Sequence, residues 1–203
     1  MNMPKYDSIF NAEEYTEEPL TEAEGLASIV LIAALADNPK ELVAPDLFLD
    51  ILGDFDLYAE YSEEDLLSMV DRLTAIVSDR GLGALFNAAD EAIPDDLVLD
   101  AYAAAILAKM NPDTGDIPAP AGVFLKELQT VLDIDDDEAA EVVAEINKSF
   151  DVVETWKSIL KVKVSFVLVP PPIKIGASST KSASLEKVLH LGKAQERTFR
   201  FAD

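Results

Sequence analysis

The sequence predicts an all-α protein, a compact bundle of about seven helices formed by a diverged helical duplication, followed by a C-terminal tail that contains a β-strand. The prediction rests on an internal repeat, on recurrent helix-start signals and on an abrupt change of composition near residue 150. With 203 residues, of which 49% are hydrophobic, the chain can bury the core of one domain and has residues left over for a second segment.

Two stretches of the chain look like copies of one unit. The first runs from Leu31 to Leu52 and the second from Ala104 to Leu128. Each contains an apolar helix, a turn marked by Asn-Pro, and a new helix with a proline near its first turn, where a missing N–H breaks no hydrogen bond. Each second helix then carries Phe-Leu-x-x-Leu for its buried face. The repeat therefore predicts two related helix-turn-helix units.

Helix-start signals predict the other helices of the bundle. Thr21 to Glu24 and Ser62 to Asp65 have the Ser/Thr-x-x-acid form, in which the hydroxyl and the acid satisfy N–H groups at a helix start. After Ser62, apolar residues recur at three- and four-residue spacing, which predicts an amphipathic helix that ends at Gly81 to Gly83. The remaining predicted helices are a short one over 84–92, one that opens at Ile93 to Asp96 and carries Ala101 to Met110, and one from Asp135 to Ile146.

The charge distribution divides the chain into parts. Residues 1–150 hold seven Lys and Arg against 34 Asp and Glu, a net charge of −27, whereas residues 151–203 hold nine against five, a net charge of +4. We therefore expect an acidic N-terminal arm over 1–19, the bundle over 20–150 and a basic tail over 151–203. Within the tail, β-branched residues predict a strand over 159–169, and Pro170 to Pro172 form a stiff spacer before a mobile end.

Composition excludes several classes of function. The net charge of −23 disfavours nucleic acid and anionic membrane surfaces, both of which attract Lys and Arg. The absence of cysteine rules out disulfides and thiol chemistry and fits a reducing, cytoplasmic location. The N-terminus has no signal-peptide core, and the longest apolar run, Leu26 to Ala36, is about half of a membrane span of roughly 20 residues. We therefore expect a soluble protein without direct membrane insertion.

These patterns resemble the TerB-like family, the all-helical domain of tellurite-resistance proteins, over roughly residues 20–150. The motifs that carry the resemblance are Ala34-Leu35-Ala36-Asp37, Phe48-Leu49-x-x-Leu52, Ala105 to Met110, Phe124-Leu125-x-x-Leu128 and Leu132-x-Ile134-Asp135. The resemblance implies a duplicated helical bundle with no established enzymatic activity, found in stress-response, metal-handling and membrane-linked signalling assemblies. It also implies acidic residues at the two helix junctions that can bind a divalent metal.

The implied metal site is degenerate in this chain. Asp37 matches the acid of the first junction and Asp46 roughly matches the acid at the following helix start, whereas Met110 and Ala121 or Gly122 stand where the second junction would have its acids. Ca²⁺ or Mg²⁺ would take oxygen ligands from a set of five acids. These candidate ligands are Asp37, Glu41, Asp46, Asp113 and Asp116. The alternative is structural: Asp46 suits a helix N-terminus, and Asp37 suits a turn cap.

The sequence contains no pattern that indicates catalysis, so we expect no enzyme and no catalytic residue. The only histidine, His190, lies in the tail with no partner specified by the sequence, and the glycines form no phosphate-binding loop. An exposed apolar strand needs a partner strand, either from the same chain or from another one. We therefore expect the tail to bind a protein partner or a second copy. The candidate partner-binding residues are Trp156, Val162, Val164, Phe166 and Leu168.

Two functions remain open from the sequence. The first is a non-catalytic interaction or scaffold protein of the TerB-like kind in a stress-response assembly, without a cofactor, whose tail docks to its own acidic face, to a second copy or to a partner's edge strand. The second is a divalent-metal-binding stress or tellurite-resistance protein. Saturable metal binding that depends on Asp37 would distinguish the second function from the first.

Overall fold

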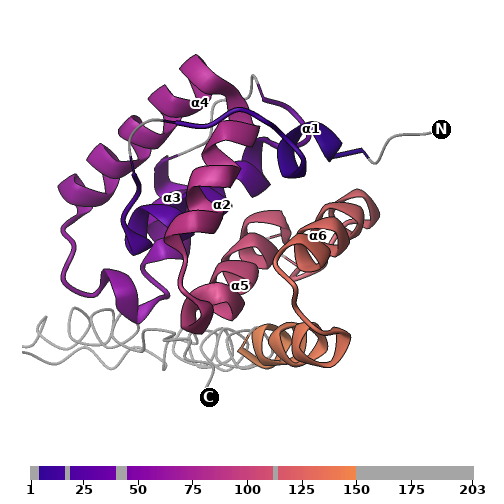
Figure 1. The fold of residues 1–203 in the computed structure, drawn as a ribbon. Coiled ribbons are helices and arrows are strands. Elements are labelled where there is room, and N and C mark those ends of the chain that lie inside the picture. Colours follow the sequence, from indigo (N-terminus) through magenta and orange to yellow (C-terminus); the bar gives the residue numbers. More distant parts are fainter. Residues whose placement is uncertain (1–4, 17–18, 40–44, 112–113, 150–203) are drawn as a thin grey trace, which may run out of the picture. The chain divides into compact units, whose positions relative to one another are not determined.

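The computed structural model describes residues 5–16, 19–39, 45–111 and 114–149, and within these ranges every regular element is a helix (Figure 1). The α-helices are α1 (Asp7–Phe10), α2 (Glu22–Leu35), α3 (Pro45–Leu52), α4 (Glu63–Ala92), α5 (Val98–Lys109), α6 (Ala119–Val131) and a last helix over 136–149. Two short 3-10 helices, η1 (Asp56–Tyr58) and η2 (Asp95–Leu97), precede α4 and α5. The prediction of a helical bundle is confirmed. The strand predicted over 159–169 lies outside the described residues.

Helix α2 is the central element of the bundle. Every residue from Ala23 to Ala33 is buried, and the helix packs against α3, α4 and α5. A helix that is apolar on all sides is stable only when it is covered on all sides, which explains the long apolar run in the sequence. The predicted capping box at its start is confirmed, since Thr21 accepts a hydrogen bond from the Glu24 N–H and Glu24 accepts one from the Thr21 N–H.

Helix α4 consists of two helical pieces that meet at Gly81. This residue has φ of +87°, a conformation that glycine adopts without the steric cost of a side chain, and it interrupts the helix where the sequence predicted an end. The first piece begins at a second confirmed capping box, formed by Ser62 and Asp65. The second piece packs beside α2 and carries Gly83, whose missing side chain leaves room for the N-terminal segment.

The repeat predicted from the sequence corresponds to the helix pairs α2–α3 and α5–α6. Pro45 is the first residue of α3, and Pro120 lies in the first turn of α6. The phenylalanine of each Phe-Leu-x-x-Leu motif, Phe48 and Phe124, is fully buried. The last helix, over 136–149, contributes the buried residues Ala139, Val142 and Ile146, which lie on one face of it.

The start of the chain belongs to the core. Tyr6, Ile9 and Phe10 are buried, and α1 packs against α4. Phe10 lies between Phe86 of α4 and Phe124 of α6, with ring centroids 4.9 and 5.5 Å away. Residues 1–19 were expected to form an acidic arm, and the structure adds that the part around α1 fills a gap between α4 and α6.

Candidate functional site

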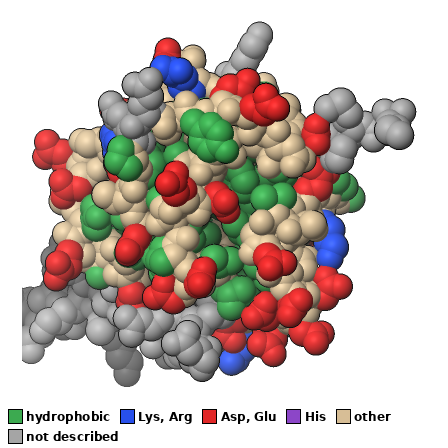
Figure 2. All heavy atoms as spheres, viewed as in Figure 1, with side chains coloured by type: hydrophobic (Ala, Val, Ile, Leu, Met, Phe, Trp, Pro, Cys, Tyr) green, Lys and Arg blue, Asp and Glu red, His purple; other side chains and the backbone are tan. Residues whose placement is uncertain are grey.

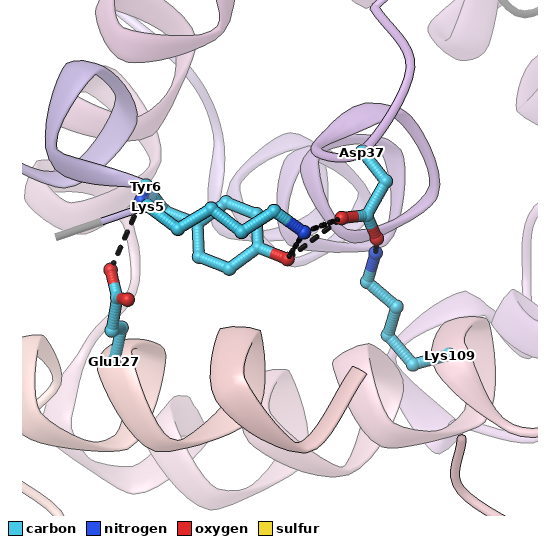
Figure 3. Close-up of polar contacts among 5 residues, drawn as sticks. All are labelled: Lys5, Tyr6, Asp37, Lys109 and Glu127. Atoms are coloured by element: carbon cyan, nitrogen blue, oxygen red, sulfur yellow. Dashed lines mark hydrogen bonds and ion pairs between the residues drawn. The ribbon is translucent and has the colours of Figure 1, made fainter. Parts of the chain in front are cut away.

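Asp37, the best-matched acid of the predicted metal site, lies directly after the C-terminal end of α2 and accepts three hydrogen bonds (Figure 3). Its Oδ1 atom accepts from Lys5 Nζ at 2.6 Å and from the Tyr6 hydroxyl at 2.7 Å. Its Oδ2 atom accepts from Lys109 Nζ at 2.7 Å. One carboxylate therefore joins the N-terminal segment, the end of α2 and the end of α5. We call these four residues, Lys5, Tyr6, Asp37 and Lys109, the Asp37 cluster.

The electrostatics of the cluster favour an ionised Asp37. Partial burial would raise the pKa of Asp37, but hydrogen bonds from Lys109, Lys5 and Tyr6 outweigh it and hold this pKa well below its usual value. The hydrogen bond to Asp37 also raises the pKa of Lys5 above its usual value. An acid at the C-terminal end of a helix is opposed by the helix dipole, and the last turn of α2 contains no basic residue. The two lysines supply the missing positive charge from other parts of the chain.

Lys109 is the most enclosed member of the cluster that carries a positive charge. Its side chain is 8% exposed, compared with 54% for Lys5. Its ammonium group lies 4.8 Å from the centre of the Phe124 ring, in addition to its bond with Asp37. A buried ammonium is costly unless it is paired, so Lys109 depends on Asp37.

Lys5 and Tyr6 approach Asp37 from the same side, as Figure 3 shows, and form a hydrogen bond with each other at 2.8 Å. The Tyr6 ring is 1% exposed and packs edge-on against Phe124 at 5.1 Å, so that its hydroxyl is aimed at Asp37. The Tyr6 N–H donates to Glu127 of α6 at 3.3 Å. These contacts fasten the N-terminal segment to α2 and α6.

The other predicted metal ligands do not join Asp37 in the described part of the chain. Asp46 lies exposed in the first turn of α3, in the helix-start position that the dipole favours. Asp116 is exposed in the loop before α6, where its carbonyl oxygen accepts from the Asn111 N–H at 2.9 Å. Glu41 and Asp113 lie outside the described residues. Within residues 5–16, 19–39, 45–111 and 114–149, the structure forms no group of three or more acids or histidines that could hold a metal ion.

The chain after α2 and the end of α5 lie close together in the structure. The residue that joins them is Lys109, which was not among the predicted metal ligands. Lys109 ends α5, one residue before Met110, and it reaches the acid at the end of α2. Met110 itself is buried and caps the end of α5. The second junction therefore supplies a cation to Asp37 where a two-junction metal site would need an acid.

The partner-binding residues predicted in the tail, Trp156, Val162, Val164, Phe166 and Leu168, lie outside the described residues, as does His190. They stay predictions. No helix in the described ranges combines the length and the apolar character that a membrane crossing requires.

The sequence reasoning missed Lys5, Tyr6, Lys109 and Glu127 as members of this site. A weak signal was present, because Lys5 and Lys109 are two of only seven basic residues among the first 150. A scarce cation in an acidic chain is a good candidate for a specific ion pair. Its partner depends on the tertiary fold, and the spacing of residues in the sequence does not identify it.

No known family model, curated protein or solved structure matches this chain.

Proposed function

We propose that this chain is a non-catalytic interaction module of the TerB-like kind, in which Asp37 anchors the fold instead of binding a metal. The observation that carries the proposal is the saturation of the Asp37 carboxylate by two ammonium groups and one hydroxyl. In TerB-like proteins the corresponding acid belongs to a metal site. Here the positive charge that a divalent ion would bring is supplied by the chain's own lysines.

Charge counting supports the anchor role. A carboxylate carries one negative charge, and the two ammonium groups bound to Asp37 carry two positive charges. A divalent cation that approached Asp37 would meet these ammonium groups at hydrogen-bond distance from the same oxygens and would have to displace them. Displacement would leave Lys109, with its 8% exposed side chain, without its anion. This cost opposes metal binding.

The binding function that we propose belongs to the surface and to the basic tail. Acidic side chains are spread over the face seen in Figure 2, with apolar side chains between them. Such a surface favours cationic partners and repels other acidic chains. We propose that the module acts in a cytoplasmic stress-response assembly, and that residues 157–169 of the tail bind a protein partner or a second copy.

Calorimetric titration of the chelator-treated full chain with Ca²⁺, Mg²⁺ and Mn²⁺ tests the proposal. We expect no saturable binding heat that depends on Asp37, and the same result for Asp37→Asn and for the surface variant Asp50→Asn, at an exposed acid that is not a candidate ligand. Saturable binding of about one ion per chain in the wild type, lost in Asp37→Asn and retained in Asp50→Asn, would replace the proposal with the metal-binding stress protein.

A further inference from the structure

Tyr61, between η1 and α4, is the exposed aromatic residue at which two surface hollows meet. One hollow, of about 560 Å³, extends over Glu60, Asp65 and Met69. The other, of about 530 Å³, extends over Glu22, Leu57 and Glu91. Both hollows include Tyr61, whose side chain is 39% exposed. We call the surface formed by the two hollows on either side of Tyr61 the Tyr61 groove.

The groove is built on a fixed backbone. The Tyr61 N–H donates to the Tyr58 carbonyl at 3.0 Å, and the rings of these two tyrosines pack edge-on at 5.6 Å. The buried Tyr58 hydroxyl in turn donates to the Ala23 carbonyl in the first turn of α2 at 2.6 Å. This chain of contacts holds the Tyr61 ring between the starts of α2 and α4, so a ligand would meet a preformed surface.

The starts of α2 and α4 flank the groove, but both are already capped. The Thr21–Glu24 and Ser62–Asp65 capping boxes bind two N–H groups at each helix start that could otherwise attract an anion. The residues that line the groove include five carboxylates, from Glu22, Glu24, Glu60, Asp65 and Glu91, against one cation, Arg72. Arg72 is bound to Glu24, and Glu22, Glu60 and Glu91 are exposed. The groove is therefore a negative surface with an aromatic ridge.

We propose that the Tyr61 groove binds a lysine- or arginine-bearing segment of a partner protein. The ammonium or guanidinium groups of the segment pair with Glu22, Glu60 and Glu91, and one of them lies over the Tyr61 ring. The apolar stems of lysine and arginine suit the partly exposed Leu57 surface beside the ring. The helical part of a second copy is a poor occupant, because residues 1–150 of each copy carry a net charge of −27. The inference rests on the proposed interaction function.

Fluorescence anisotropy with a dye-labelled peptide of alternating lysine and valine tests the groove in the full chain. We expect Tyr61→Ser, and separately the pair Glu60→Gln and Glu91→Gln, to raise the Kd about threefold to tenfold at physiological ionic strength. The matched controls are Tyr15→Ser and the pair Glu138→Gln and Glu141→Gln, which are exposed elsewhere. We expect these controls to change the Kd less than about twofold.

Three results would overturn the groove proposal. The first is an equal rise in Kd for the control pair Glu138→Gln and Glu141→Gln, which would show that the peptide binds through general charge attraction. The second is an absence of peptide binding by the wild type. The third is binding that emerges only after Lys157, Lys161 and Lys163 are replaced by glutamine, which would assign the groove to the chain's own tail. Asp37→Asn does not enter this assay, so failure of the groove is separable from failure of the anchor role.

Discussion

The position of Asp37 explains why its charge is neutralised from within the chain. It follows the C-terminal end of α2, where the helix dipole disfavours an anion. Lys5 and Lys109, from two distant segments, bind it and balance its negative charge. A residue type and a motif position that suggest metal binding can therefore serve a structural purpose. The decisive information is which side chains the fold brings to the carboxylate.

Removal of the Tyr6 hydroxyl is the smallest change that tests the Asp37 cluster. Tyr6→Phe keeps the ring that packs against Phe124 but removes the hydroxyl, which donates to Asp37 and accepts from Lys5. We expect the free energy of unfolding to fall by about 1 kcal/mol, the net value of a typical hydrogen bond. Urea unfolding measures the change, and Tyr15→Phe, at a side chain that is 65% exposed, should leave stability within about 0.5 kcal/mol of the wild type. A Tyr6→Phe protein as stable as the wild type would show that the hydroxyl bond is not needed.

The pKa of Asp37 predicts how acid affects stability. Because this pKa is lower in the folded chain than in the unfolded one, protons bind the unfolded state first, and the stabilisation from Asp37 is lost as pH falls below about 3.9. We expect the stability difference between the wild type and Asp37→Asn to be constant from pH 7 to pH 5 and smaller at pH 3. Chemical unfolding at each pH measures it. A difference that grows at pH 3 would have the wrong sign for an ionised, hydrogen-bonded Asp37.

At the scale of elements, the sequence predicted the helix starts and breaks that depend on residues close together in the chain. The capping boxes at Thr21 and Ser62, the break near Gly81 and the prolines that open α3 and α6 all act within a few residues, and each is present in the structure. The contribution of α1 to the core was not predictable in this way. Four helical residues carry little periodic signal, and the burial of Phe10 depends on Phe86 and Phe124, more than 70 residues away.

Gly83 gives an element-level prediction. A side chain at this position would collide with Ala12 Cβ and would lie 2.9 Å from the Ser8 carbonyl oxygen, so Gly83→Ala should displace the N-terminal segment from α4. We expect a loss of about 1–3 kcal/mol in the free energy of unfolding and faster proteolysis near residues 11–20. Gly122→Ala in α6 is the control, because nothing lies within 4 Å of its added carbon and alanine favours a helix. Equal effects of the two substitutions would contradict the close packing at Gly83.

At the scale of the molecule, the described helices and the chain beyond them differ in charge as well as in composition. Contacts group the described residues up to Ile146 into one compact unit. The boundaries expected after residues 19 and 150 stay predictions. The candidate site was only partly predictable: Asp37 was identified from its motif, but its partners come from the start of the chain and from the end of α5. Sequence spacing cannot reveal contacts between positions 5, 37 and 109.

The division of the chain predicts the behaviour of a truncated protein. We expect residues 1–150 alone to unfold cooperatively on heating and to remain soluble, because the helices described here bury a continuous core around α2. Circular dichroism during heating and light scattering measure the two properties. A fragment without a cooperative transition would show that residues 151–203 complete the core.

The measurement that tests the anchor role of Asp37 most directly is a double-mutant cycle with Lys109. The single variants Asp37→Asn and Lys109→Met and the double variant are unfolded in urea at pH 7, with methionine chosen to keep the packing on Phe124. We predict a coupling energy of about 1 kcal/mol or more between the two side chains, because Asp37→Asn leaves the enclosed Lys109 ammonium without its anion and the double variant removes that ammonium. A coupling energy near zero would show that the pair does not anchor the fold, and would leave Asp37 free for another role.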